Sequence, residues 1–533
     1  MKSKPPTSDE PGASLAGRRV DLLALTAIVA LAVGLRAWRL NDRGLWFDEA
    51  FSWRLTTFDW GEMVRRAALD NNPPLYYLLL KLWTTCFGAS RGAMRSLSAL
   101  AGTAVCLATY LFVREAYRAD GGRRFVPPDQ ARWTALVAAA LVATSVLQIR
   151  WSWEARMYSL GALLAALSSW LLLRALHAPQ APSRWLAYAA SALAFAYTHT
   201  FALFSLLAQG LYALGYLSRA GCQTADRAAA LVAGKRRWAG PLLAAVAVAA
   251  AYAPWLTVLS AQHEQVRQSF WIGPLTRASV PKAAYALFVD PMETAMDDGQ
   301  GWVWAGACAV VLIALMFRPV AADGLFFLSA AVPIGMAAAV SAWDTPIFYP
   351  RYFVFAELFL LAAVARLAGR VPGRPEKWII AVVVLGSFLL IDYDFLGGLR
   401  AENSGGLRAA AESIVARRGP REPVVVCSPY FYLPMRYELG GAGCQLLDSG
   451  RPLPHFDGAA ALTPHDFISA AQAARCGARR IWVVEGGGHA AVCTPPRERW
   501  QRWSEHSFFE PYGIVGALTV VEYVAVAGKK LPD

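Results

Sequence analysis

The chain has 533 residues, of which 56% are hydrophobic, and its mean hydropathy is +0.35. Ordinary soluble domains are less apolar, so this composition indicates a membrane protein. The formal net charge of +13 would suit a nucleic-acid-binding protein. However, the basic residues lie mostly in short loops between apolar segments, as they do in the cytoplasmic loops of membrane proteins. We therefore interpret the charge as a sign of membrane topology and expect no nucleic-acid partner.

Residues 1–19 are polar and predict a cytoplasmic tail. After this tail, apolar runs of about 17–20 residues recur, and each is long enough to cross a bilayer as a helix. If every strongly basic loop is cytoplasmic, residues 20–394 form a helical transmembrane domain with about eleven spans. The predicted spans lie near residues 20–38, 95–113, 132–149, 157–175, 185–198, 200–217, 239–259, 301–317, 322–341, 351–369 and 377–393.

The first predicted outer loop, residues 39–94, contains the sequence LWFDEAFSW at 45–53. Its adjacent carboxylates, Asp48 and Glu49, are costly so close to a membrane unless they face water, a metal or a substrate. The apolar run at 73–88 could be a further span, but the basic loops that follow would then lie outside. We therefore predict that this run is an interfacial helix on the outer face of the membrane.

Three polar segments meet on the predicted outer face, at residues 39–94, 148–160 and 344–355. Each has a simple alternative explanation, because aromatic and basic residues also contact lipid headgroups. Acids and arginines that converge from three segments nevertheless favour a site. The outer face has no ATP or nucleotide sugars, so an activated group must arrive on a lipid carrier. A lipid-linked phosphate fits, because arginines can bind its charge and a carboxylate can deprotonate an acceptor hydroxyl.

Six stretches resemble a known family in their order along residues 20–395: GLWFDEAFSW, NNPPLYYLLLKLW, GAMRSLSALAG, WEARMYSL, YTHTFALF and YPRYFVF. They are similar to family 39 type glycosyltransferases of the GT-C superfold, which are related to protein O-mannosyltransferases and to the aminoarabinose transferase of lipid A. The resemblance implies a hexosyl- or pentosyltransferase of the bacterial inner membrane. Such an enzyme moves a sugar, usually with inversion, from a polyprenyl-phosphate carrier to a hydroxyl of a lipid, glycan or protein acceptor at the periplasmic face.

The resemblance also implies roles for single residues. The first-loop pair of the family falls on Asp48, the expected base, and on Glu49, which either positions the loop by accepting hydrogen bonds or helps to bind the acceptor or a metal. The next outer acidic position falls on Glu154, the alternative base. The pair that holds the carrier phosphate falls on Arg351 and Tyr352. The family's arginine ahead of the second span falls on Arg95, which is also expected to bind substrate or phosphate. We assign further substrate and phosphate contacts to polar residues of the predicted outer face: Arg150, Arg156, Lys81, Asn72, Tyr76 and His199.

Two features leave the cofactor open. Many relatives have His-Pro-Pro where this chain has Asn72 followed by two prolines, and an amide can form hydrogen bonds but cannot titrate. Some GT-C enzymes use a divalent cation and others do not, so no cofactor is certain. If Mg²⁺ or Mn²⁺ binds, its expected ligands are Asp48, Glu49 and Glu154.

Residues 395–533 differ in character and predict a small α/β domain on the periplasmic side, which either shapes the acceptor site or caps the membrane domain. Its strands are expected in EPVVVCS, CQLLD, RRIWVVEG and GALTVVEYVAV, and its helices in RAAAESIVARR and PHDFISAAQAAR. Disulfides can form on this side of a membrane. The positions of the cysteines relative to the strands favour the pairs Cys427–Cys493 and Cys444–Cys476.

Two other functions stay open as alternatives. A polymerase or ligase of surface polysaccharide also uses lipid-linked sugars outside the cell, but it would depend on arginines and histidines of large outer loops rather than on an early Asp-Glu pair. A transporter of lipid-linked sugars would have many spans and two related halves. No internal repeat is evident in this sequence, which favours the transferase.

Overall fold

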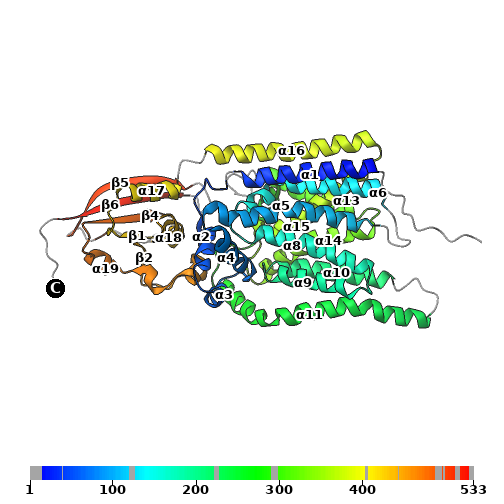
Figure 1. Ribbon diagram of the computed structural model, residues 1–533, viewed down its shortest axis with the longest axis horizontal. Coiled ribbons are helices and arrows are strands. Elements are labelled where there is room, and N and C mark those ends of the chain that lie inside the picture. Colours follow the sequence, from blue (N-terminus) through cyan, green and yellow to red (C-terminus); the bar gives the residue numbers. More distant parts are fainter. Residues whose placement is uncertain are drawn as a thin grey trace, which may run out of the picture.

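The computed structural model describes residues 15–526, apart from 39, 119–125, 221–226, 290–297, 402–405, 442, 487–494, 496–498 and 511–515. A bundle of long helices forms one part of the molecule, and a six-stranded sheet with its own helices forms the other (Figure 1). This arrangement confirms the predicted class, a polytopic helical membrane protein with a small C-terminal α/β domain.

The bundle contains most of the helices that sequence analysis expected as spans. Six described helices are long and apolar enough to cross a membrane, or seven if one bent pair counts as a span, so the predicted number of eleven stays a prediction. The helices of the whole bundle, including those that do not reach this length or hydropathy, are α1 (Leu15–Ala37), α5 (Arg91–Ala116), α6 (Pro128–Ala143), α7 (Val146–Ser152), α8 (Tyr158–His177), α9 (Pro182–Ala196), α10 (Ala202–Ala220), α11 (Arg227–Gln268), α12 (Ser279–Phe288), α13 (Asp298–Leu315), α14 (Ala321–Trp343), α15 (Val354–Gly369) and α16 (Arg374–Ala401).

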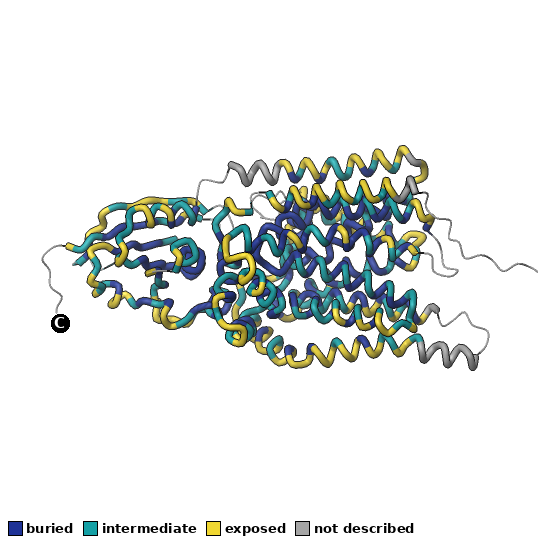
Figure 2. Tube along the Cα trace, viewed as in Figure 1, coloured by how far each residue is buried: buried dark blue, intermediate teal, exposed yellow. Residues whose placement is uncertain are grey.

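Burial separates the central helices from the peripheral ones. Helices α5, α6, α8 and α15 are largely buried, whereas α1, α11 and α16 lie at the periphery with much exposed surface (Figure 2). The exposed positions on these outer helices include large apolar residues such as Leu23, Leu243 and Val382. Water-soluble proteins rarely expose apolar patches of this size, so these surfaces face lipid. The chain is therefore a multi-pass membrane protein.

The predicted span at 132–149 is bent by 55° between α6 and α7. Such a break leaves carbonyl groups at the end of α6 without helical partners. The buried side chain of Arg36 donates hydrogen bonds to the carbonyls of Val142 and Ala143, both at 3.0 Å. Ser145 caps the start of α7, because its Oγ accepts a hydrogen bond from the backbone N–H of Gln148 at 3.2 Å. Polar side chains therefore stabilise the bend.

Three short helices lie between the bundle and the C-terminal domain: α2 (Phe47–Thr56), α3 (Trp60–Ala68) and α4 (Leu75–Phe87) (Figure 1). Helix α4 occupies the run at 73–88, and its 13 residues are too few to cross a bilayer. Its position at a membrane interface stays a prediction. The Asp-Glu pair lies in the first turn of α2, inside the segment that sequence analysis treated as a loop.

The C-terminal domain has a mixed sheet with the strand order β3-β2-β1-β4-β6-β5, in which β6 runs antiparallel to its neighbours β4 and β5 and the other pairs are parallel. The strands are β1 (Val424–Val426), β2 (Cys444–Leu447), β3 (Phe467–Ile468), β4 (Arg480–Gly486), β5 (Trp500–Glu510) and β6 (Gly516–Ala525). The helices are α17 (Gly406–Arg417), α18 (Pro429–Glu438) and α19 (Ala470–Arg475). The sequence did not predict β5, which is mostly polar and exposed, or α18, which contains an internal proline. Of the helix expected in PHDFISAAQAAR, only α19 is α-helical, and the 3-10 helix η5 (Pro464–Asp466) and β3 occupy the first half of that segment.

The cysteines of this domain only partly follow the expectation. Cys427 is disulfide-bonded, but its predicted partner Cys493 lies outside the described residues. The predicted bridge Cys444–Cys476 is wrong, because both residues are free cysteines. Cys444 is buried in β2, and burial raises the pKa of its thiol to about 12, so it is unreactive at neutral pH.

The orientation of the bundle gives a topology prediction. Arg91, at the start of α5, forms an ion pair of 2.9 Å with Glu438 of the C-terminal domain. The 26 residues of α5 extend about 39 Å at 1.5 Å per residue, so its last residue lies at the far end of the bundle. We expect a reporter fused after residue 125 or 225 to be cytoplasmic and one fused after residue 400 to be outside. A cytoplasmic signal from the fusion after 400 would contradict this topology.

Candidate active site

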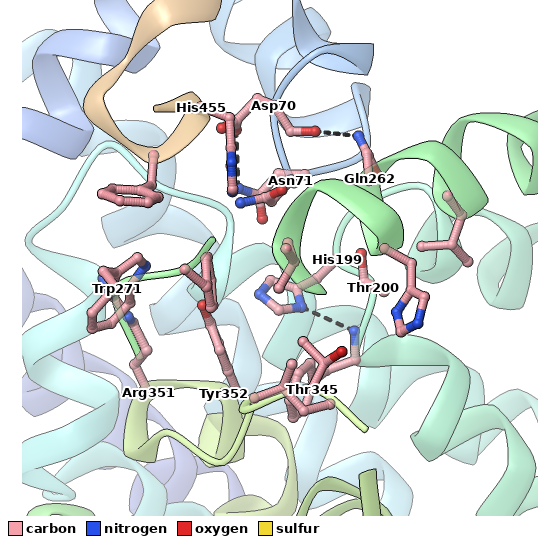
Figure 3. Close-up of a pocket in the computed structure, with 18 of the residues that line it drawn as sticks. Asp70, Asn71, His199, Thr200, Gln262, Trp271, Thr345, Arg351, Tyr352 and His455 are labelled. Carbon is pink, nitrogen blue, oxygen red and sulfur yellow. Dashed lines mark hydrogen bonds between the residues drawn. The ribbon is translucent and has the colours of Figure 1, made fainter. Parts of the chain in front are cut away.

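A cavity of about 540 Å³ lies at the end of the bundle next to the C-terminal domain (Figure 3). Five parts of the chain line it: the first outer loop with α2, the turn before α8, the α9–α10 turn, the segment from the end of α11 to Trp271, and the segment 344–352. Residues 455–458 of the C-terminal domain complete the wall. The structure therefore brings the three polar segments of the sequence together, as predicted.

Asp48 lies between two arginines on the wall of this cavity. Its Oδ2 is 3.2 Å from Nη1 of Arg351 and 3.9 Å from Nε of Arg156. Arg156 is held in place by further contacts, because its Nη1 donates to Tyr77 Oη at 3.1 Å and to Ser52 Oγ at 3.3 Å. Two guanidinium groups thus face the one carboxylate of Asp48 here, and Asp70, which also lines the cavity, acts on Arg156 from further away. Such a site suits an anionic ligand.

Aromatic rings surround the guanidinium of Arg351. Its central carbon lies 4.6 Å from the ring centre of Trp271, 5.0 Å from that of Tyr349 and 5.8 Å from that of Tyr352. These contacts orient the guanidinium and stabilise its charge. Its Nε makes no hydrogen bond to the described residues and is free to bind a ligand. Arg351 and Tyr352, assigned together from the sequence, both line the cavity.

Glu49 faces away from the cavity and is completely buried. Its two oxygens accept hydrogen bonds from Nε and Nη2 of Arg95, both at 2.7 Å, and Oε1 also accepts from the backbone N–H of Ala155 at 3.0 Å. Burial acts to raise the pKa of this carboxyl, but Arg95 outweighs it and holds the pKa below its ordinary value. The pair is a structural ion pair, so its geometry does not support direct catalysis by Glu49 or phosphate binding by Arg95.

Glu154 and Arg150 form a second buried ion pair that does not line the cavity. Burial raises the pKa of Glu154, and the nearby charge of Glu49 acts in the same direction. Glu154 and Arg150 therefore have no access to a substrate in this cavity, and their geometry does not support the predicted catalytic role of Glu154 or the predicted ligand-binding role of Arg150. The three carboxylates assigned as metal ligands each face a different arginine, and no group of three metal-ligating side chains occurs in the described part of the chain.

His199 presents a fixed hydrogen-bond donor to the cavity. Its Nδ1 accepts a hydrogen bond from the backbone N–H of Phe201 at 3.1 Å, which places the proton of the neutral ring on Nε2 (Figure 3). That Nε2 is buried and has no hydrogen-bond partner in the described structure. Burial, together with the charges of Arg156 and Arg351, lowers the pKa of His199 to about 3. The imidazole is therefore neutral at physiological pH.

Three other assigned residues are divided between the cavity and the scaffold. Asn72 lines the cavity and donates a hydrogen bond of 3.2 Å to Asp70. Lys81 instead stabilises the end of α2, where its Nζ donates to two backbone carbonyls at 2.9 and 2.6 Å. Tyr76 is buried and shares a hydrogen bond of 2.9 Å with Ser98. Lys81 and Tyr76 are therefore scaffold residues, contrary to their assignment.

Asp70, Trp271 and His455 also line the cavity, although they were not predicted as site residues from the sequence. The segment QSFWIGP at 268–274 is aromatic and lies between apolar runs, which is a signal for Trp271. His455 lies in a loop of the C-terminal domain, and no local pattern marks it. Only the contact between the two parts of the chain places it here.

No protein-family model matches the chain, and no curated protein matches it. The structure is similar to ArnT from Cupriavidus metallidurans bound to undecaprenyl phosphate, with 13% identity, a TM-score of 0.58 and coverage of 95% of this chain and 98% of that chain. The apo state of ArnT matches with 11% identity and the same TM-score of 0.58. A weaker likeness, with 12% identity, a TM-score of 0.46 and coverage of 81% of this chain and 65% of that chain, links it to the oligosaccharyltransferase of Archaeoglobus fulgidus. The chain therefore has the GT-C fold expected from the sequence.

The ion pair of Glu49 and Arg95 should determine stability. We expect Glu49→Gln to lower the free energy of unfolding by about 3–5 kcal/mol, because it leaves Arg95 buried without a counter-charge. Asp48→Asn is the matched control, because the side chain of Asp48 is 20% exposed at the cavity. Thermal unfolding in detergent should therefore show a large decrease in Tm for Glu49→Gln and a small one for Asp48→Asn. Equal values of Tm would contradict the assignment.

The lowered pKa of His199 predicts a pH dependence of stability. Above pH 6.5 the ring is neutral in both the folded and the unfolded state, but at lower pH only the unfolded state takes up the proton until the folded pKa, about 3, is reached. His199 therefore makes unfolding easier by about 2 kcal/mol at pH 5. We expect Tm to fall less between pH 7 and pH 5 in His199→Gln than in wild type. His465→Gln, at an exposed position, should behave as wild type, and an unchanged decrease in His199→Gln would refute this role.

Proposed function

We propose that the protein is a glycosyltransferase that moves a hexosyl or pentosyl group from a polyprenyl-phosphate carrier to an acceptor hydroxyl. The observation that carries this proposal is the position of Asp48 between Arg156 and Arg351 on the wall of one cavity. A carboxylate beside two arginines supplies both a base and a phosphate site. The fold of ArnT, which was solved with undecaprenyl phosphate, supports the same class of ligand.

The phosphate of the donor would bind to the two arginines. A phosphodiester has two unesterified oxygens that share one negative charge, and each arginine can offer a fork of N–H donors. The free Nε of Arg351 and the Nε–H of Arg156, which makes no hydrogen bond to the described residues, are available for these bonds. The incoming phosphate competes with Asp48 for the same guanidinium groups. Donor binding thus releases the carboxylate to accept a proton.

The transfer itself needs one proton acceptor and one leaving group. Asp48 removes the proton of the acceptor hydroxyl as its oxygen attacks the anomeric carbon from the face opposite the phosphate. The bond from that carbon to the phosphate oxygen breaks, and its electron pair leaves with the polyprenyl phosphate. Arg156 and Arg351 stabilise the charge that develops on the leaving phosphate. The anomeric configuration is inverted.

A divalent cation was expected, if present, on Asp48, Glu49 and Glu154. These residues do not fit such a site, because each is bound to a different arginine and the three do not converge. The proposed mechanism uses the guanidinium groups as its cations and includes no metal step. We place the reaction at the outer, periplasmic face of a bacterial inner membrane, where the excess of basic loop residues on the other side would orient the chain.

The base is tested by Asp48→Asn, which retains the shape but not the proton acceptor. We expect turnover of undecaprenyl-phosphate-linked sugars, measured as released undecaprenyl phosphate, to fall by about 10²–10⁴. Binding of undecaprenyl phosphate should be retained, because the arginines remain. Arg351→Lys is the matched contrast and should weaken that binding, since a lysine cannot hold two oxygens in the fixed geometry of a guanidinium. Full turnover in folded Asp48→Asn would remove the carboxylate from the mechanism.

A further inference from the structure

We propose that His455 of the C-terminal domain, together with Asn71 of the first outer loop, binds the hydroxyl groups of a sugar ring in the cavity. The inference rests on the proposed glycosyltransferase function and names a part of the site that recognises the sugar. It makes the C-terminal domain a part of the substrate site rather than a cap on the bundle.

His455 is placed for binding a ligand. It lies in the short helix η3 (His455–Asp457), is only 8% exposed and lines the cavity. Its Nε2 is buried without a hydrogen-bond partner among the described residues, and so is Oδ1 of Asn71. In the view of Figure 3, His455, Asp70 and Asn71 lie at one end of the cavity and Arg351 and Tyr352 at the other. The unpaired groups thus lie away from the phosphate end.

The chemistry of these two groups suits uncharged hydroxyls. Burial lowers the pKa of His455, although the charge of Asp457 opposes the shift, so the ring is neutral at physiological pH. A neutral imidazole has one N–H donor and one acceptor nitrogen, and the amide oxygen of Asn71 is an acceptor. A hydroxyl can both donate and accept. Buried polar groups without partners cost free energy, so a ligand that pairs them gains affinity.

Aromatic rings connect this end of the cavity to the phosphate end. The ring of Phe270 is stacked on that of His455, with centroids 6.0 Å apart and an angle of 6° between the planes. Phe270 contacts Trp271 at 5.6 Å, and Trp271 lies against Arg351 at 4.6 Å. Flat aromatic surfaces pack against the apolar face of a sugar while polar groups fix its hydroxyls. A ring attached to a phosphate at Arg351 would have this wall beside it.

The loop that carries His455 is held by several contacts to α2 and α3. Arg54 of α2 forms an ion pair of 3.2 Å with Asp466, and Arg66 of α3 donates to the carbonyls of Ala460 and Leu462 at 2.7 and 2.9 Å. Gly458 has a φ of +80°, and a Cβ there would lie 3.0 Å from the ring of Phe47. These contacts fix the loop against α2 and α3, so the position of His455 is defined by the fold.

The alternative is that His455 only packs against Phe270, and His455→Phe separates the two cases. Phenylalanine keeps a ring for stacking but removes both nitrogens. His465→Phe is the matched control, because His465 is exposed in the same domain and does not line the cavity. The probes are undecaprenyl phosphate and undecaprenyl phosphate that carries one glucose, mannose or galactose. Affinity for each lipid is measured in detergent with the folded full-length protein.

We expect wild type and His465→Phe to bind at least one sugar-bearing lipid more tightly than bare undecaprenyl phosphate. His455→Phe should lose about tenfold in affinity for that lipid, as for one hydrogen bond between neutral groups. Its affinity for the bare lipid should stay unchanged. Asn71→Ala should have a similar, smaller effect. This result would show that the sugar ring bound by His455 belongs to the donor.

If the lipid affinities are unchanged but His455→Phe raises KM for the acceptor, the sugar ring that His455 binds would instead belong to the acceptor. That arm uses saturating sugar-bearing lipid and a membrane extract of the native host as acceptor. Unchanged lipid affinities together with an unchanged KM would overturn the role of His455. If wild type bound neither the bare nor any sugar-bearing lipid, the proposed function itself would fail, and the inference with it.

Discussion

The buried ion pair between Arg95 and Glu49 is the constraint on which the site depends. All five N–H groups of Arg95 are used: two bind the carboxylate of Glu49, and three bind the carbonyls of Leu40, Arg43 and Gly44. One side chain of α5 thereby fixes the chain that leads into α2. Successive residues of a helix are separated by about 100° around its axis, so holding Glu49 toward Arg95 turns Asp48 in another direction, toward the cavity. The two adjacent carboxylates are distinguished by their arginine partners.

Two arginines then determine where in the cavity an anion can bind. Arg156 and Arg351 share the single carboxylate of Asp48, and the rings around Arg351 limit its movement. In the proposed mechanism, an anion that displaces Asp48 gains two cations and frees a base in the same step, which would couple donor binding to activation of the acceptor. His199 contributes a donor that does not change with pH above its pKa of about 3. The C-terminal domain completes the wall through His455, so both parts of the chain form one site.

Much of this could be predicted from the sequence, and the failures have physical reasons. Apolar runs predicted the bundle, and the convergence of polar segments predicted the site. Both predictions work because apolar segments pack against lipid or other helices, whereas charged segments must face water, a ligand or a counter-charge. The partners of charged residues could not be predicted, since Arg95, Arg150 and Lys81 look like ligand-binding residues until tertiary contacts show what they bind. His455 was missed for the same reason, because it reaches the cavity only through packing between the sheet domain and α2 and α3. The free thiols of Cys444 and Cys476 show that the position of a cysteine at the end of a strand does not by itself determine disulfide pairing, since β1 separates β2 from β4 in the sheet.

An experimental structure of the protein with undecaprenyl phosphate bound would show directly whether Arg156 and Arg351 hold the phosphate. We expect phosphate density between the guanidinium groups of Arg156 and Arg351, with the Asp48 carboxylate moved away from its present distance of 3.2 Å to Arg351. The pair of Glu49 and Arg95 should be unchanged in the same structure. Phosphate bound elsewhere, with the contact between Asp48 and Arg351 intact, would rule out the two arginines as the phosphate site.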